Sequence, residues 1–210
     1  MTNRGRPAPC YLGPDDAPAK KKILAEALRL FVRDGLCETS IRDIARASGY
    51  TNPALFKHFA SKDALARHLF EACYVSLFDA LEGAVSAAEG YRARRHALVA
   101  AYLDRLDADR DALLYVQDHL RHFWPKMPAH VRRRSIAGEV HALLQLGRAE
   151  GAVTDALPID FLVTGWLGVT QQFARAWFFG AFPGPARRHT NRLEALLAQM
   201  TAPPRPVRRS

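Results

Sequence analysis

Apolar residues recur along most of the chain with the spacing of an α-helix, and this periodicity limits the fold more than any other feature. Between Lys20 and Asp34, for example, Ile23, Ala27, Leu30 and Phe31 share one helix face. Long period-two alternation is nearly absent, as are Asn-Gly or Asp-Gly hairpin turns between apolar runs. The sequence therefore predicts an all-α protein.

Glycine, proline and capping residues divide this pattern into about nine helices. Ser40 followed by Asp43 is typical of a capping box, Gly35 is expected to end the first helix, and Thr51 with Pro53 is expected to begin the third. The expected helices cover residues 20–34, 41–48, 52–59, 61–90, 92–108, 110–123, 128–149, 158–181 and 185–200.

The charge distribution indicates a basic head on a nearly neutral body. Residues 1–70 carry 12 Lys and Arg against 7 Asp and Glu, whereas residues 71–202 carry 15 against 14. A compact basic segment fits a nucleic-acid-binding module better than a cationic membrane binder. We expect a flexible basic arm over 1–19, a DNA-binding head over 20–67, a larger domain over 68–201 and a disordered basic tail over 202–210.

Other classes of protein have little support in the sequence. Cys10, Cys37 and Cys73 form no CxxC pair, so we expect neither a disulfide framework nor a zinc ribbon, and the reducing cytosol is the expected compartment. The sequence lacks the G-x-S-x-G, P-loop, H-E-x-x-H and G-x-G-x-x-G motifs. We therefore expect no enzyme activity and no cofactor; a small cytosolic enzyme stays a remote alternative.

The expected helices 41–48 and 52–59 are joined by a turn of about three residues that contains Gly49. This is the helix-turn-helix arrangement, in which the second helix enters the major groove of DNA. A glycine turn between two short helices also occurs in proteins that bind no DNA. The spacing alone leaves both interpretations open.

A longer set of residues resembles the TetR-type (tetracycline-repressor-like) transcriptional regulators. The resemblance covers about Ile23 to Leu69 and is carried by the runs Ile41-Arg42-Asp43-Ile44-Ala45, Ala47-Ser48-Gly49-Tyr50-Thr51, Ala54-Leu55-Phe56-Lys57-His58-Phe59 and Ser61-Lys62-Asp63-Ala64-Leu65. One residue departs from the family pattern: Phe56 stands where the family usually has a Tyr whose hydroxyl contacts a phosphate.

The resemblance implies a three-helix DNA-binding head and a set of contact residues. Asparagine and lysine can read base edges, but Lys57 and His58 fit phosphate contacts equally well. The N-terminal end of a helix favours a bound phosphate. This adds the residues at the start of the expected helix 41–48 and Lys62 at the start of the expected helix 61–90. The implied DNA-binding residues are Thr39, Ser40, Arg42, Thr51, Asn52, Ala54, Lys57, His58 and Lys62.

The N-terminal Arg4-Gly5-Arg6-Pro7 run can act in two ways. Short Arg-rich arms bind narrow minor grooves, whereas a disordered basic tail adds only nonspecific attraction. The Pro- and Gly-rich spacer that follows favours the second interpretation.

The last two expected helices are apolar on nearly every face, which exceeds what one helix face needs inside a monomer. The resemblance implies that they pack against the same helices of a second copy, so that two heads read a palindromic operator. The expected interface residues are Phe161, Gly165, Gly168, Trp177, Leu193, Leu196, Leu197 and Met200.

The resemblance also implies an effector pocket among the aromatic residues of the middle helices. Each of these residues, taken singly, also fits ordinary core packing. The candidate ligand-binding residues are Phe70, Tyr74, Tyr102, His119, Phe123, Trp124 and Trp166. His119 and His122 with Asp118 invite a metal site, but no third ligand is suitably spaced, so we expect no metal.

We therefore expect a homodimeric repressor in the bacterial cytoplasm, associated with the nucleoid and released from its operator by a small, mostly apolar ligand. A DNA regulator or coating protein without an effector is the main alternative. It predicts weak sequence preference and no response to a ligand.

Overall fold

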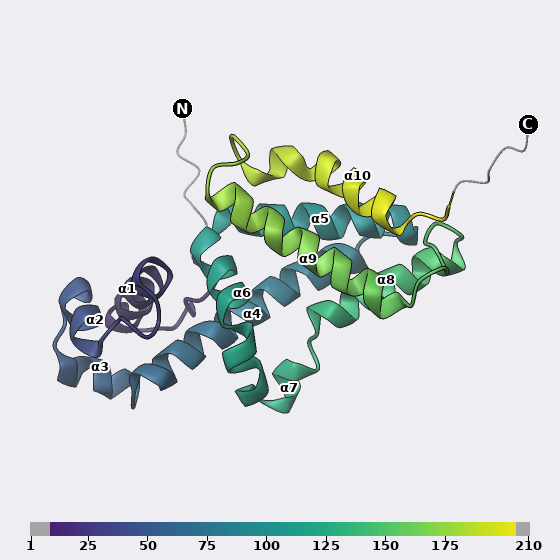
Figure 1. The fold of residues 1–210 in the computed structure, drawn as a ribbon. Coiled ribbons are helices and arrows are strands. Elements are labelled where there is room, and N and C mark those ends of the chain that lie inside the picture. The colour runs from purple at the N-terminus through teal and green to yellow at the C-terminus, as the bar shows by residue number, and fades with distance from the viewer. Residues whose placement is uncertain (1–8, 205–210) are drawn as a thin grey trace, which may run out of the picture. The chain divides into compact units, whose positions relative to one another are not determined.

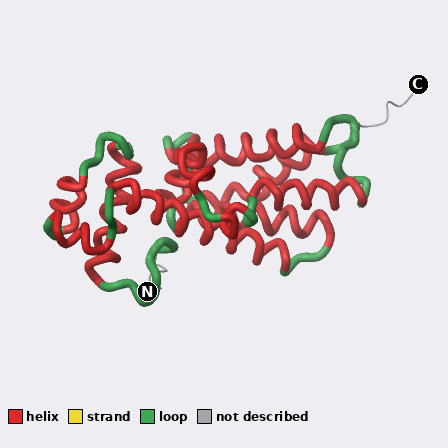
Figure 2. The backbone as a smooth tube through the Cα atoms, turned by 90° about the horizontal axis from the view of Figure 1, so that it is seen from below, coloured by secondary structure: helices red, strands yellow, loops and turns green. Residues whose placement is uncertain are grey.

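The structure, a computed structural model, describes residues 9–204. These residues form helices joined by loops, and none of them lies in a strand (Figure 2). This confirms the all-α expectation. The elements are α1 (Pro18–Asp34), α2 (Ile41–Ser48), α3 (Asn52–His58), α4 (Lys62–Ser86), α5 (Gly90–Ala108), α6 (Arg110–Phe123), η1 (Trp124–Lys126), α7 (Ala129–Arg132), α8 (Ile136–Ala149), α9 (Ile159–Phe178), η2 (Ala186–His189) and α10 (Thr190–Thr201).

The chain forms two compact units that do not follow the expected boundary at residue 67. The first contains the chain up to Leu77 together with Ala108–Arg133, and the second contains Phe78–Asp107 together with the chain from Arg134 onward. The unit that holds α1 to α3 thus also includes α6 and α7, which the sequence had assigned to the second domain.

Residues 9–17 differ from the expected flexible arm. Tyr11 is only 8% exposed, and the Cys10 thiol lies 3.8 Å from a carboxylate oxygen of Asp109. Asp16 forms an ion pair with Lys20 in the first turns of α1, at 2.7 Å. The expected arm at Arg4 and Arg6, and residues 205–210 of the expected tail, lie outside the described residues.

Local sequence signals explain how the helices of the first unit begin and end. Pro18 occupies the first turn of α1, where its missing N–H costs no hydrogen bond. Ser40 and Asp43 form the expected capping box of α2, since the Asp43 N–H donates to the Ser40 hydroxyl and the Ser40 N–H donates to the Asp43 carboxylate. Gly49 ends α2 at φ 75°, a left-handed conformation that favours glycine.

Helix α6 packs on α1 and completes the core of the first unit. The rings of Phe31 and Tyr115 stack with centroids 5.9 Å apart. The Tyr115 hydroxyl donates to the backbone carbonyl of Ala66 in α4 at 2.9 Å. The ring stacking and this hydrogen bond thus join α6 to α1 and α4, which are far apart from it in the sequence.

The second unit is built around α8, α9 and α10, and α9 and α10 run side by side (Figure 1). The expected helix 128–149 is two helices, because the Ser135 hydroxyl accepts from the Gly138 N–H and starts α8 anew. Gly147 permits close packing in α8, since a Cβ there would lie 2.5 Å from a Val153 methyl. Across residues 9–204, no helix combines the length and apolar character needed to cross a membrane.

Candidate nucleic-acid interface

Helices α2 and α3 are joined by a tight turn that confirms the helix-turn-helix spacing. Gly49 ends α2, and Thr51 is the residue that precedes α3, although its side chain makes no capping bond. Pro53 lies in the first turn of α3, as expected. Leu55 is 1% exposed and fixes the inner face of α3.

The outer side of this motif carries most of the predicted DNA-contact residues. Arg42, Thr51, Lys57 and His58 are exposed, and Asn52 and Ala54 are partly exposed. Ser40 is also exposed, although its hydroxyl already accepts a hydrogen bond from the Asp43 N–H in the cap of α2. The structure brings these residues onto one motif of the first unit, where polar and cationic groups can meet an anionic partner.

The start of α2 already holds one anion, the Asp43 carboxylate. The hydroxyl and the N–H of Ser40 both donate to the Asp43 carboxylate, and these hydrogen bonds hold the pKa of Asp43 below its usual range. Arg42 stands exposed in the same turn. A phosphate near this end would meet both the helix dipole and a guanidinium.

Two predicted DNA-contact residues have other roles. Thr39 is 2% exposed, and its hydroxyl donates to the backbone carbonyl of Gly35 at 2.8 Å. The side chain is therefore part of the turn between α1 and α2. Of the two hydroxyls before α2, the one on Ser40 is therefore exposed and the one on Thr39 is buried.

Lys62 also has a structural role, and its environment explains why a cation begins a helix. Its ammonium donates to the carbonyls of Leu36 at 2.8 Å, Cys37 at 3.3 Å and Thr39 at 2.8 Å. These carbonyls supply negative potential beside the ammonium. Lys62 thus joins the first turn of α4 to the turn that precedes α2, and no pattern in the sequence indicates this contact.

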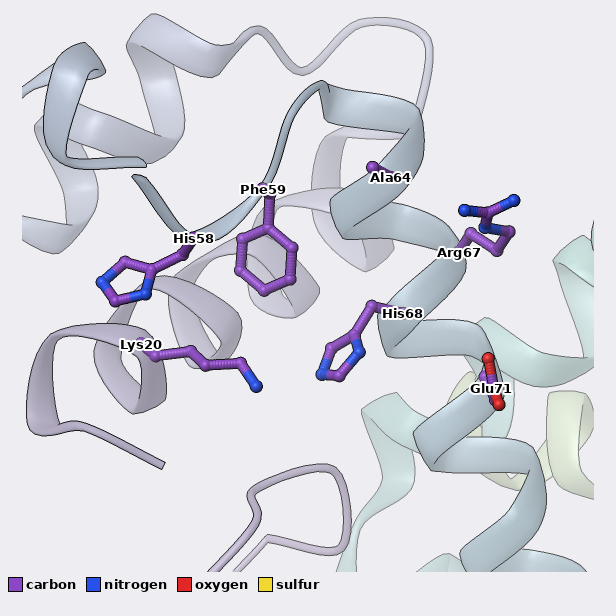
Figure 3. Close-up of a pocket in the computed structure, with 7 residues that line it drawn as sticks. All are labelled: Lys20, His58, Phe59, Ala64, Arg67, His68 and Glu71. Atoms are coloured by element: carbon purple, nitrogen blue, oxygen red, sulfur yellow. The ribbon is translucent and has the colours of Figure 1, made fainter. Parts of the chain in front are cut away.

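Sequence reasoning also missed an open pocket of about 290 Å³ behind the end of α3. Figure 3 shows Lys20 and His68 pointing toward the space beside Phe59, whereas Arg67 points away from it. The rings of Phe59 and His68 are 5.4 Å apart, and the Lys20 ammonium lies 6.0 Å from the Phe59 ring. The pocket is lined by Lys20, His58, Phe59, Ala64, Arg67, His68 and Glu71.

The pocket carries less positive charge than its residues suggest. Asp16 pairs with Lys20, and the hydrogen bond from Lys20 lowers the pKa of Asp16. Burial, assisted by the nearby Lys20 ammonium, lowers the pKa of His68 and favours its neutral imidazole. The arrangement therefore packs the last turn of α3 against α1 and α4.

The candidate ligand-binding residues divide between the two units. Phe70, Tyr74, His119, Phe123 and Trp124 lie in the first unit. The Phe70 and Phe123 rings are 5.3 Å apart, the Tyr74 and Trp124 rings 4.8 Å, and the His119 and Phe123 rings 6.1 Å. Phe70 and Phe123 are fully buried, so both contribute to the core.

Tyr102 and Trp166, the other two candidates, belong to the second unit. The Tyr102 hydroxyl donates to the backbone carbonyl of Thr170 at 3.0 Å. Trp166 is buried in α9. Both side chains thus pack within that unit.

Several expected interface residues make contacts within their own chain. Leu193 and Leu197 are buried, and a Cβ at Gly165 would lie 3.2 Å from the Met200 sulfur. The Trp177 indole N–H donates to the carbonyl of Gly184 at 2.9 Å. The sequence showed that α10 is apolar on several faces, but which face meets α9 is decided by packing.

The remaining expected interface residues are on the surface. Phe161 is 70% and Leu196 50% exposed, and a Cβ at Gly168 would meet no atom within 4 Å. The structure adds further exposed apolar side chains that sequence reasoning did not assign, namely Leu157, Phe178, Phe179 and Phe182. A surface this rich in large apolar groups indicates an interaction site.

The two histidines that the sequence offered as metal ligands contact other side chains. The ring centroids of His119 and Tyr115 are 4.7 Å apart with tilted planes, and His122 lies 3.0 Å from the Lys126 ammonium. Within residues 9–204, no three His, Cys, Asp or Glu side chains are grouped so that they could hold a metal ion.

Comparison with known proteins gives a specific match for the first unit. Residues 23–69 match the family model of bacterial regulatory proteins, tetR family. The HTH-type transcriptional repressor KstR2 of Rhodococcus jostii is 31% identical over 112 residues, which are 51% of this chain and 55% of that protein. The HTH-type transcriptional regulator AcrR of Shigella flexneri is 40% identical over 52 residues, 25% of this chain and 24% of that protein.

The matched region thus spans about half the length of the Rhodococcus relative. The similarity in fold covers more of the chain than the similarity in sequence does. The structure of the ketosteroid transcriptional regulator KstR2 of Mycobacterium tuberculosis superposes with a TM-score of 0.77, covering 89% of this chain and 96% of that chain at 21% identity.

The Lys62 contacts give a test of stability. Lys62→Met keeps the aliphatic stem but removes the ammonium that three carbonyls share, so we expect a loss of about 1.5–3 kcal/mol in the free energy of unfolding. Lys57→Met, an exposed change five residues earlier, is expected to alter it by less than about 0.5 kcal/mol. Urea unfolding of the full chain measures both, and equal stability of the two variants would contradict the assigned role.

Proposed function

Since residues 23–69 match the family model of bacterial regulatory proteins, tetR family, we propose that this chain is a sequence-specific DNA-binding transcriptional repressor. It acts in the bacterial cytoplasm on nucleoid DNA. Helix α3 enters the major groove, which is wide enough for one helix. The observation that carries this proposal is the family match over a helix-turn-helix whose outer side is polar and cationic.

The proposed contacts follow from the exposed residues. Asn52 and Lys57 on α3 reach base edges, because asparagine pairs bidentately with adenine and lysine donates to guanine acceptors. Ala54 and His58 flank them on the same helix, and Thr51 immediately precedes it. Ser40 and Arg42 at the start of α2 contact phosphate, whereas Thr39 and Lys62 support the fold.

Base reading is tested by separate Asn52→Ala and Lys57→Ala substitutions. Each is expected to cost roughly 1–3 kcal/mol of binding free energy on the selected site and to relax the preference at particular base pairs. Arg42→Ala is the matched control for a phosphate contact: it is expected to weaken all sequences alike and to reduce the salt slope by about one. Binding of duplexes at several salt concentrations measures these effects.

The DNA for this test is obtained by selecting fragments of the source genome that the protein retains. A repressor is expected to enrich discrete palindromic sites, whereas a coating protein would retain all fragments nearly alike. Unchanged specificity in a double Asn52→Ala, Lys57→Ala variant would place base reading elsewhere.

The second unit is proposed to form a homodimer through the exposed side of α9 and α10. Phe161 and Leu196 supply large apolar contacts, and Gly168 leaves room for close approach. A twofold dimer presents two heads, which matches the symmetry of a palindromic operator.

Leu196→Glu tests the dimer. Leu196 is half exposed, so a carboxylate there leaves each protomer folded, but in a dimer it would be buried without a partner at a cost of several kcal/mol. We expect wild-type dimers and mutant monomers by sedimentation at micromolar concentration, with matching helical content by circular dichroism. Gln199→Glu, another exposed α10 change, is the control for added charge. A monomeric wild type would refute the dimer.

We also propose that a small, mostly apolar ligand releases the protein from DNA. The ring cluster of Phe70, Tyr74, Phe123 and Trp124 in the first unit supports an apolar ligand, since aromatic surfaces of this kind line apolar ligand sites. Release requires that the ligand bind the conformation without DNA more tightly.

Trp124→Ala tests the effector proposal, because Trp124 is partly exposed whereas Phe70 and Phe123 are core residues. Among uncharged polycyclic and long-chain compounds, we expect at least one that raises the thermal midpoint of the wild type and weakens its DNA binding. Both responses should be lost in the variant, with DNA affinity unchanged. If no compound shifts either quantity, the proposal of an effector is wrong.

A further inference from the structure

Phe56 is the one large apolar side chain of the described first unit that stands half exposed, at 50%. The other exposed large apolar residues among those described all lie in the second unit: Leu157, Phe161, Phe178, Phe179, Phe182 and Leu196. An isolated exposed phenyl ring in a well-packed unit would be unremarkable on an arbitrary surface. Here it lies on α3, the helix that the proposed function inserts into DNA.

The helix geometry places Phe56 toward that partner. Leu55 is buried and marks the inner face of α3. At about 100° per residue, Phe56 lies about 100° and Lys57 about 200° from Leu55 around the helix. Phe56 and the exposed Lys57 therefore share the outer half of α3. A helix that brings Lys57 to base edges brings the Phe56 ring into the same groove.

The chemistry of the groove narrows what the ring can contact. Base edges in the major groove present hydrogen-bond donors and acceptors, and the single apolar group is the C5-methyl of thymine. A phenyl ring makes no ordinary hydrogen bond, so covering a base donor or acceptor with it removes water without replacing the lost bond. Contact with a methyl group instead buries apolar surface on both sides.

We propose that Phe56 packs against a pyrimidine C5-methyl group and thereby selects a T·A pair at one position of each operator half-site. This inference rests on the proposed function. Burial of one methyl group contributes about a fourfold increase in affinity, and two half-sites about sixteenfold. Phe56 is thus a specificity-determining residue that acts without hydrogen bonds.

The experiment uses the full chain and the duplex that it enriches most strongly from a random-sequence pool. Each thymine of this duplex is replaced in turn by uracil, which differs from thymine only by the missing methyl. We expect one position per half-site at which uracil weakens wild-type binding about fourfold. In Phe56→Ala the same replacement is expected to have no effect.

A second arm separates the methyl group from the rest of the base pair. At the sensitive position, T·A is replaced by C·G and then by 5-methylcytosine·G. The methylated pair is expected to bind the wild type about fourfold more tightly than the unmethylated pair. Phe56→Ala is expected to bind both alike, which distinguishes recognition of the methyl from recognition of thymine as a whole.

Two control variants complete the design. Lys57→Ala is expected to lose affinity but keep the uracil effect, because its contact is with polar groups. Phe56→Tyr keeps the ring and is expected to keep the effect. Because Phe56 is half exposed, Phe56→Ala is expected to retain the wild-type thermal midpoint, so a lost uracil effect reports the contact and not unfolding.

Two results would overturn the proposal while leaving DNA recognition intact: equal wild-type affinity for thymine and uracil at every position, or a uracil effect that persists in Phe56→Ala. If the pool yields no enriched duplex, sequence-specific DNA binding fails, and the role of Phe56 falls with it.

Discussion

The ammonium group of Lys62 holds the first turn of α4 against the turn that leads into α2, and the DNA-facing motif is positioned by this contact. Three carbonyls between residues 36 and 39 receive its hydrogen bonds, and α2 starts immediately afterwards. A charged donor shared among carbonyls is stronger than a neutral hydrogen bond. A displacement of α4 is therefore expected to move α2 with it, which would give the proposed ligand a physical route to the helix-turn-helix.

Helix α3 has seven residues and depends on its neighbours for stability, because isolated helices of this length do not persist in water. Leu55 anchors its inner face, and Phe59 is held by the His68 ring and the Lys20 side chain. Burial keeps the His68 imidazole neutral, so a second positive charge beside Lys20 is avoided. The outer residues of α3 are thus free of structural duties and available for recognition.

Local signals in the sequence predicted most of the fold, since the Ser40 capping box, Gly49 and the apolar periodicity depend on neighbouring residues. Contacts between distant segments were not predictable in this way. The role of Lys62 depends on carbonyls more than twenty residues earlier. Likewise, α10 is apolar on several sides, and only packing decides that Leu197 faces inward while Leu196 faces solvent. The structural roles of Thr39 and Lys62 were not predictable for the same reason.

The inclusion of α6 and α7 in the first unit has a consequence for biosynthesis. Tyr115 stacks on Phe31 and donates to the Ala66 carbonyl, so the core around α1 stays open until Arg133 has left the ribosome. At 5–20 residues per second, the stretch from Leu77 to Arg133 takes roughly 3–11 s to translate. During that interval the Phe31 side of α1 lacks its partner on α6, so the first unit is expected to close only late in synthesis.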